Sequence, residues 1–194
     1  MSHSDVVNGH FVQKEKVPLE IPNIPDDYRE YLDVFSIQKT KSLPDHRPYN
    51  LAIQIEDNKM LPLGPIYSLL TLELKTLQEF LEENLWIGTI CLSKSSCGAL
   101  VLFVKKKDGT LHLYVDYQDL NQLIHKDYYP IFLLNNLLDT SRKAWVYSKI
   151  DLKNVYHLVC IAKGNEWKIA FCTRYSSFEW LVMLFGLSNA PAVF

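Results

Sequence analysis

The sequence has 194 residues, 48% hydrophobic and 12% aromatic, so it can bury the core of one ordinary domain or two small ones. Its formal net charge of −2 argues against a nucleic-acid binder that works by global charge. The longest apolar stretch, residues 99–104, is too short to cross a bilayer, and the first residues lack the pattern of a signal peptide. We therefore expect an intracellular, soluble chain that is not secreted.

Charge and cysteine are both unevenly placed. Residues 141–174 contain seven Lys or Arg and two acidic residues, whereas residues 1–60 contain seven basic and ten acidic residues. The basic stretch is where a nucleic-acid strand or a phosphate would be handled. The four cysteines lack Cys-x-x-Cys spacing and a matching histidine pattern, so neither a zinc site nor a disulfide framework is indicated.

The N-terminal part is expected to be extended. Residues 1–42 mix charge with proline and have apolar periodicity only over Tyr28–Phe35, which predicts a linker with one short helix. Prolines then punctuate the following region, in which Leu51–Ile55 predicts a short strand.

The strongest helical pattern lies at Leu72–Ile87, where leucines recur on one face. Thr71 is expected to cap its start and Gly88 its end. Thr71 has the short hydroxyl side chain of an N-cap, and glycine tolerates the left-handed conformation that ends many helices.

A hairpin is predicted next, with strands at residues 99–104 and 111–115 around a turn at residues 108–109. Three consecutive lysines, Lys105–Lys107, lie at its tip. Charge at a hairpin tip is mostly solvated surface, so by itself it is weak support for phosphate binding.

The C-terminal third is predicted to alternate helix and strand. A short helix is expected at Leu133–Leu138, a buried strand at Trp145–Ile150 and a hairpin over Trp167–Met183 that turns near Tyr175. Residues from 185 onward are expected to form a loop that leads into a helix.

The predicted strand at Trp145–Ile150 would deliver Asp151 at its end, with Tyr156 following after four residues. This relationship can place a metal ligand beneath a nucleotide. Most isolated aspartates at strand ends cap the following turn instead, so the pair carries little weight alone.

Four motifs in a fixed order carry more weight than any single residue. They are Val104-Lys-Lys-Lys-Asp-Gly, Val115-Asp-Tyr-Gln-Asp-Leu-Asn, Tyr147-Ser-Lys-Ile-Asp-Leu-Lys-Asn-Val-Tyr-His and Met183-Leu-Phe-Gly-Leu-Ser-Asn-Ala-Pro-Ala-Val-Phe. Together they resemble the fingers and first palm motifs of gypsy-type reverse transcriptases, which belong to the polyproteins of LTR retrotransposons, a class of transposable element. The resemblance covers roughly residues 25–194.

The resemblance implies an α+β fold, an incomplete right-hand polymerase made of a fingers subdomain and the first strands of the antiparallel palm sheet. It divides the chain into three parts. Residues 1–42 would be an extended linker with a short helix, residues 43–144 a fingers-like region, and residues 145–194 a partial palm that stops before a Tyr-x-Asp-Asp motif.

The activity implied by the resemblance is RNA-directed DNA synthesis, a nucleotidyl transfer assisted by two magnesium ions. Asp151 matches a catalytic, metal-binding carboxylate. The resemblance also implies partners, namely an RNA or DNA template–primer, a deoxynucleoside triphosphate and the missing half of the polymerase, in the cytoplasm or a virus-like particle. The positions that match nucleotide contacts are Lys106, His112, Leu152, Lys153, Tyr156, Phe185 and Gly186.

Each matched position has an implied role. Lys106 would contact the triphosphate, and the backbone at Leu152 and Lys153 would approach it. Tyr156 would exclude a ribose 2′ hydroxyl. Phe185 and Gly186 would lie against the sugar and the template.

The chain also departs from the family pattern. His112 stands where an arginine is expected, and a neutral imidazole lacks the guanidinium fork. Most departures can each arise from one transition, so we hypothesise a degenerate element whose DNA suffered cytosine deamination. The other replaced positions are Cys91, Ser96, Leu100, Gln118, Val155, Cys160, Cys172, Ser176 and Leu184.

Three interpretations remain open. The chain is a polymerase fragment that is inactive alone, because one carboxylate is a poor substitute for a site built from three. Alternatively it is a non-catalytic remnant that binds nucleic acid or protein. In the third interpretation it folds poorly, because apolar residues such as Leu181, Val182 and Phe185 are left uncovered.

Overall fold

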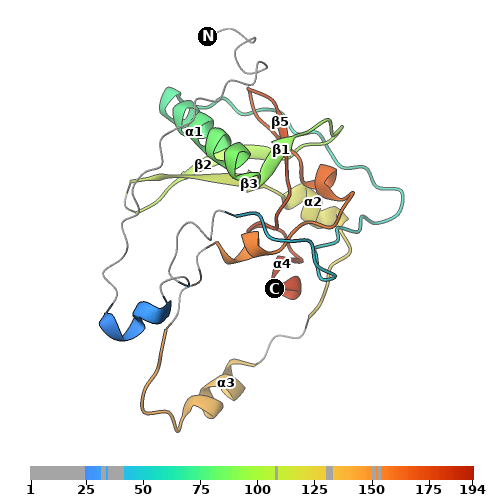
Figure 1. Cartoon of the computed structure of the whole chain (residues 1–194). Helices are drawn as coiled ribbons and strands as arrows, with labels where there is room; N and C mark the ends of the chain where they lie inside the picture. Colours follow the sequence, from blue (N-terminus) through green and yellow to red (C-terminus); the bar gives the residue numbers. More distant parts are fainter. Residues whose placement is uncertain are drawn as a thin grey trace.

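The computed structural model describes residues 25–31, 34, 42–107, 109–129, 133–149, 152 and 154–194 (Figure 1). Its α-helices are α1 (Thr71–Ile87), α2 (Gln118–Leu123), α3 (Leu134–Ser141) and α4 (Ala190–Val193). The strands are β1 (Ile90–Leu92), β2 (Leu100–Lys105), β3 (Leu111–Asp116), β4 (Phe171–Cys172) and β5 (Ser177–Trp180). Short 3-10 helices are η1 (Asp26–Tyr31), η3 (Val155–Leu158) and η4 (Glu166–Ile169).

Helix α1 confirms the strongest helical prediction, but its start differs from the expected one. Thr71 is the first helical residue, not the cap, and the N-cap position is held by Leu70. The Glu73 carboxylate accepts the Leu70 N–H at 2.8 Å, which replaces the expected hydroxyl cap. Gly88 ends the helix as predicted, at φ +86, and its N–H donates to the Asn84 carbonyl.

Strands β2 and β3 form the predicted hairpin, paired from Leu100↔Asp116 to Lys105↔Leu111. Side chains alternate between its two faces. Val101 and Val115 on the odd-numbered face are buried, and α1 packs on this side (Figure 1). The even-numbered face therefore points away from α1.

A second sheet has the antiparallel strand order β1-β5-β4. Its β4–β5 hairpin confirms the predicted turn near Tyr175, and the turn is closed by a hydrogen bond from the Thr173 hydroxyl to the Ser176 carbonyl at 2.8 Å. The start of the predicted hairpin was wrong, because Glu166–Ile169 forms η4 and not a strand. Strand β1 belongs to the predicted fingers-like region and pairs with β5 of the predicted palm. The boundaries between those regions stay predictions.

One hydrophobic core joins the two sheets and α1. Ala99, just before β2, forms a parallel bridge with Phe171 of β4. The Phe171 ring stacks on Phe178 with centroids 5.6 Å apart, and Phe80 of α1 meets Trp180 edge-on at 6.0 Å. These aromatic side chains thus fasten the hairpin, the sheet and the helix together.

The predicted buried strand at Trp145–Ile150 is wrong over its described part. Trp145 is 98% exposed and Val146 84% exposed, and neither belongs to a strand. An apolar run becomes a buried strand only where a neighbouring strand edge accepts its hydrogen bonds, and none of the described strands pairs with it. Ile150 lies outside the described residues.

Two N-terminal predictions were also inaccurate. Leu51 and Ile55 make isolated bridges to Ile161 and Ile124, so Leu51–Ile55 is not a continuous strand. The predicted helix at Tyr28–Phe35 is seen as the 3-10 helix η1, which ends at Tyr31; Phe35 lies outside the described residues.

The remaining helices agree with the predictions at Leu133–Leu138 and after residue 185, where α3 and α4 form. Helix α3 buries none of its residues. Among the supposed uncovered residues, Val182 was wrongly assigned, since it is 0% exposed in the core, whereas Phe185 is 65% exposed. None of the described helices is both long enough and apolar enough to span a membrane.

Candidate functional site

Three aromatic side chains meet around Tyr156, and we call them the aromatic cluster: Tyr156, Phe185 and Phe194. The Tyr156 and Phe185 rings meet edge-on with centroids 4.4 Å apart, and Tyr156 and Phe194 do so at 5.6 Å. Tyr156 is half-buried, while Phe185 and Phe194 are exposed. Two of the predicted site residues, Tyr156 and Phe185, are therefore in contact although 29 positions separate them.

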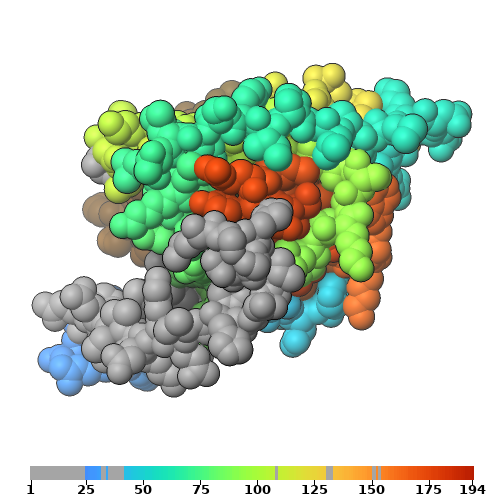
Figure 2. Space-filling view, turned by 90° about the horizontal axis from the view of Figure 1, so that it is seen from above, coloured from blue at the N-terminus to red at the C-terminus, as the bar shows by residue number. Residues whose placement is uncertain are grey.

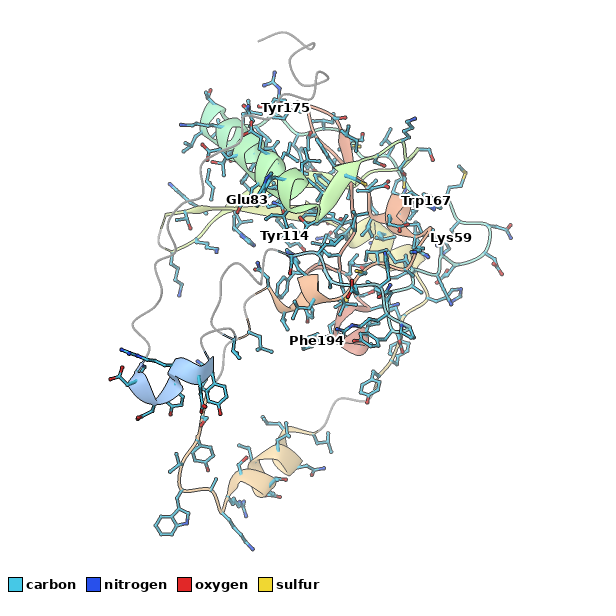
Figure 3. All side chains as sticks on the ribbon, in the orientation of Figure 1. Lys59, Glu83, Tyr114, Trp167, Tyr175 and Phe194 are labelled. Carbon is cyan, nitrogen blue, oxygen red and sulfur yellow. The ribbon has the colours of Figure 1, made fainter. Side chains whose placement is uncertain are left out.

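The next residue, Gly186, brings the aromatic cluster close to the hairpin. Gly186 has φ +96, and a side chain added there would lie 3.6 Å from the Tyr114 hydroxyl. Tyr114 lies on the even-numbered face of β3, on the side of the hairpin opposite to α1 (Figure 3). We call this face, formed by Leu102, Val104, His112 and Tyr114, the hairpin inner face.

Two asparagine side chains hold the loop at Gly186 in place. Asn121 of α2 donates to the Gly186 carbonyl at 2.6 Å and accepts the Ser188 N–H at 2.9 Å. In the opposite direction, buried Asn189 donates to the His125 carbonyl at 2.8 Å and accepts the Asp127 N–H at 3.1 Å. The loop is thus fixed to residues 121–127 by four side-chain hydrogen bonds.

Lys106 and His112 lie on the hairpin as predicted from the sequence. His112 is exposed on β3 and pairs with Val104, and exposed Lys106 follows two residues after Val104. The tip is closed by the Lys106 N–H donating to the Thr110 carbonyl at 2.9 Å and by the Gly109 N–H donating to the Lys106 carbonyl at 3.0 Å. These backbone bonds leave the Lys106 ammonium free to reach solvent or a ligand.

The predicted metal ligand lies outside the described residues. Asp151 and Lys153 are not among them, and Leu152 is 60% exposed. Asn154 next to them has φ +51, and Val155 begins η3. Among the described residues of this turn, the left-handed one is therefore Asn154, which tolerates that conformation, and not the β-branched Val155.

Beside the aromatic cluster, burial shifts the pKa of two side chains. Burial lowers the pKa of His157, whose ring lies 5.8 Å from that of Trp180. Complete burial raises the pKa of Tyr117, whose hydroxyl donates to the Ile169 carbonyl at 3.0 Å. Both side chains are uncharged at neutral pH.

The predictions from the sequence missed Tyr114, Asn121 and Asn189. The two asparagines were inside the quoted motifs, Asn121 at the end of Val115–Asn121 and Asn189 within Met183–Phe194. The motif spacing could have singled them out as polar residues in apolar surroundings. It could not show that Asn121 hydrogen-bonds to the loop at residues 186–188, or that Asn189 hydrogen-bonds to residues 125–127.

The family model described as "Reverse transcriptase (RNA-dependent DNA polymerase)" matches residues 104–194. Curated relatives include the Transposon Tf2-3 and Tf2-4 polyproteins of Schizosaccharomyces pombe (strain 972 / ATCC 24843). Each is 36% identical over 177 residues, which is 89% of this chain and 13% of the relative. The chain thus spans about an eighth of the length of these relatives.

Solved structures show the same fold. The prototype foamy virus protease-reverse transcriptase (CSH mutant) has a TM-score of 0.63 at 21% identity, over 89% of this chain and 24% of that chain. The foamy viral protease-reverse transcriptase in complex with dsDNA has a TM-score of 0.62 at 22% identity, over 89% of this chain and 37% of that chain. The described chain is therefore a partial domain of the predicted mixed helix-and-sheet fold.

Proposed function

The chain carries part of the reverse transcriptase domain of a retrotransposon polyprotein, and on this premise we propose that it binds template–primer and nucleotide but does not polymerise DNA alone. We assign it to the gypsy type. The parent activity is RNA-directed DNA synthesis, and the expected location is the cytoplasm or a virus-like particle.

One observation carries the proposal: Gly186, which follows Phe185 of the aromatic cluster, lies against Tyr114 of the hairpin inner face. The rings of Tyr156 and Phe185 are in contact, and a Cβ added at Gly186 would lie 3.6 Å from the Tyr114 hydroxyl oxygen. Exposed aromatic rings provide stacking surfaces for bases and sugars, and the lysines at the hairpin tip provide charge for phosphates. A strand lying on this face would meet both.

We assign the contacts residue by residue. Lys106 and His112 would contact the triphosphate, and the backbone at Leu152 and Lys153 would approach it. Tyr156 would exclude a 2′ hydroxyl. Phe185 and Gly186 would lie against the sugar and the template. The side-chain hydrogen bonds of Asn121 and Asn189, which we call the asparagine clamps, hold this loop against residues 121–127.

Magnesium is the ion that we propose for the complete domain, with Asp151 as one ligand. The described residues contain no group of three His, Cys, Asp or Glu that could hold a metal. Magnesium requires nearly octahedral oxygen coordination, so the described residues do not by themselves fit a two-magnesium site.

We further propose that the element is degenerate, and the pairing of Cys91 with Glu179 supports this. The two residues are direct cross-strand partners in β1 and β5. The Glu179 carboxylate accepts the Ser93 hydroxyl at 2.7 Å and the Cys91 thiol at 3.6 Å. A thiol gives a carboxylate little stabilisation, whereas an arginine at position 91 would give it a cation.

The binding proposal is tested by fluorescence anisotropy with a labelled template–primer at several salt concentrations. Replacing Lys106 and Lys107 by Gln should weaken binding and lower the magnitude of the salt slope by about one for each phosphate that is no longer neutralised. Lys75→Gln on the exposed side of α1 is the matched control and should leave the slope unchanged. If Lys75→Gln lowered the salt slope as much per lysine replaced as the change at Lys106 and Lys107, the proposed surface would be contradicted.

Primer extension with magnesium, together with a melting curve, tests these interpretations. Salt-sensitive binding without incorporation favours a chain that binds nucleic acid but does not catalyse, which is the result expected of the non-catalytic remnant and also of a fragment that is inactive alone. Incorporation by the purified polypeptide would disprove the claim of inactivity. A broad, non-cooperative melt without binding would instead favour the poorly folding product.

A protein-binding role is the second candidate, and α3 favours it. Leu134, Leu137 and Leu138 of this helix are all more than half exposed, and the helix buries no residue. Apolar faces of this kind are normally covered by another element. We propose that the remainder of the polymerase covers this apolar face of α3. The chain should then pull down the downstream segment of the polyprotein, and Leu137→Asp should abolish this binding.

A further inference from the structure

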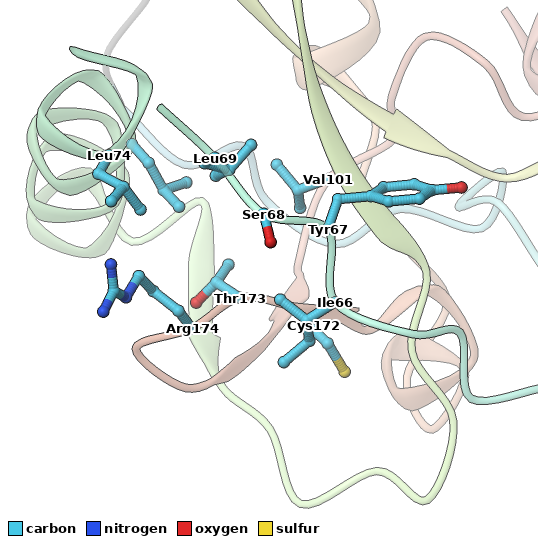
Figure 4. Close-up of a pocket in the computed structure, with 10 residues that line it drawn as sticks. Ile66, Tyr67, Ser68, Leu69, Leu74, Val101, Cys172, Thr173 and Arg174 are labelled. Carbon is cyan, nitrogen blue, oxygen red and sulfur yellow. The ribbon is translucent and has the colours of Figure 1, made fainter. Parts of the chain in front are cut away.

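A pocket of about 370 Å³ lies between α1, β2 and the turn that follows β4 (Figure 4). Leu77 of α1 and Val101 of β2 form its inner wall and are only 0% and 5% exposed. Leu74 and Cys172 extend this wall. Because these residues belong to the packed core, the inner wall is formed before any ligand arrives, and the volume lies within the usual range for ligand sites.

The segments that line the pocket adjoin one another on one face of the molecule. In the view from above, the orange-red surface of the C-terminal hairpin is bordered by the teal and green surface of α1 and the residues before it (Figure 2). The hydroxyl of Tyr175 donates to the Leu74 carbonyl at 3.4 Å, so one side of the opening is tied to α1. The Gly64 N–H donates to the Gly98 carbonyl at 3.2 Å, which ties the segment before Ile66 to the residues before β2.

Two polar side chains at the rim of the pocket are available to bind a ligand. Within the described part of the chain, neither Arg174 nor Ser68 has a side-chain hydrogen bond or ion pair. Figure 4 shows the Ser68 hydroxyl directed into the pocket and the Arg174 guanidinium at its α1 side. The Thr173 hydroxyl, by contrast, is used within its own turn.

The charge of the lining specifies the ligand. Arg174 is its one charged residue, and the lining holds no acidic residue among the described ones. A guanidinium favours a carboxylate, since the planar fork matches two carboxylate oxygens. The apolar wall favours a hydrocarbon body, which a small hydrated anion such as phosphate does not provide.

We propose that this pocket binds a small carboxylate with an apolar body. The carboxylate accepts hydrogen bonds from Arg174, and the body packs on Leu77 and Val101. The site is distinct from the proposed nucleic-acid surface, because Val101 and Tyr114 lie on opposite faces of the β2–β3 hairpin.

The test uses 4-phenylbutyrate as the probe and its neutral amide as the matched ligand control. Binding is followed by NMR on the methyl signals of Leu77 and Val101 in the full chain. The proposal predicts saturable shifts at both residues with 4-phenylbutyrate. It predicts about tenfold weaker binding of the amide, which cannot form the charge-assisted bidentate hydrogen bonds with Arg174.

Two substitutions supply the protein controls. Arg174→Gln should weaken 4-phenylbutyrate binding about tenfold and leave binding of the amide unchanged, whereas Arg174→Lys should retain part of the preference for the acid. Arg174 is exposed, so both variants are expected to fold. If either melts early, the comparison of acid with amide on the unmodified chain decides the question.

Three results would overturn the proposal: absent methyl shifts, equal affinity for the acid and the amide, or shifts centred on Tyr114. Saturating template–primer should not compete with 4-phenylbutyrate, and competition would also overturn a separate site. Because the pocket assay needs no nucleic acid, its failure is distinguishable from failure of the proposed function.

Discussion

Gly98→Ala should destabilise the protein through one atom, the sulfur of Cys172. A Cβ at Gly98 would lie 2.3 Å from the Cys172 Sγ, closer than real Cβ atoms approach their neighbours. Cys172 is buried, with 8% exposure, so we expect an overpacking cost of about 1–3 kcal/mol in the free energy of unfolding. The φ of Gly98 is outside the left-handed region, so backbone strain does not contribute.

The double variant Gly98→Ala, Cys172→Ala isolates this effect. Without the sulfur, the nearest atoms to the new Cβ are the Cβ at position 172 and the Leu63 Cδ1, both at 3.5 Å, which is an ordinary van der Waals distance. Cys172→Ala alone should cost about 1 kcal/mol through the smaller buried apolar surface. The double variant should therefore cost less than the sum of the single ones by roughly 1–3 kcal/mol.

The assay is urea unfolding followed by circular dichroism and by tryptophan fluorescence, since coincident transitions justify a two-state treatment. Additive costs within about 0.5 kcal/mol would refute the reasoning. Gly98→Ala costing nothing would mean that the thiol turns into the neighbouring pocket instead.

Two further predictions concern ionisable groups. Burial lowers the pKa of His157 from 6.5, so just below pH 6.5 the unfolded chain binds more protons than the folded one, and the free energy of unfolding should fall as the pH drops through that value. His157→Phe should flatten this part of the plot of unfolding free energy against pH. An unchanged plot would contradict the assignment. Cys91→Arg should raise the free energy of unfolding by about 0.2–1 kcal/mol relative to Cys91→Ala, because the arginine pairs with Glu179. Salt at about 1 M should reduce this gain. If urea unfolding shows the alanine variant to be equally stable or more stable, this support for an ancestral arginine is removed.

The elements predicted best from the sequence are those whose stabilising interactions are local. The α1 pattern contains its own stop signal at Gly88, and the β2–β3 hairpin contains its own turn at residues 108–109, of which Gly109 is described. Local hydrogen bonds decide both elements, so periodicity and turn residues are sufficient to find them.

The elements predicted worst depend on distant partners. Strand β1 has three residues and exists because β5, almost ninety positions later, pairs with it. Trp145–Ile150 has a comparable apolar pattern, but its described residues have no strand partner, and Trp145 and Val146 remain exposed. Periodicity describes what a segment can do, and pairing across the chain decides what it does.

The site shows the same division. The ordered motifs identified Tyr156, Phe185 and Gly186, and the structure brings these three together. Tyr114 and the asparagine clamps escaped notice because their roles come from interactions between motifs. Asp151 and Lys153 lie outside the described residues, so their assignments stay predictions.

Photo-crosslinking of a template–primer to the chain, read out by mass spectrometry, tests the central claim most directly. The account predicts crosslinks on the hairpin inner face and the aromatic cluster, at residues such as Tyr114, Tyr156 and Phe185, and their disappearance at high salt. Crosslinks confined to α1, or none at low salt, would contradict it.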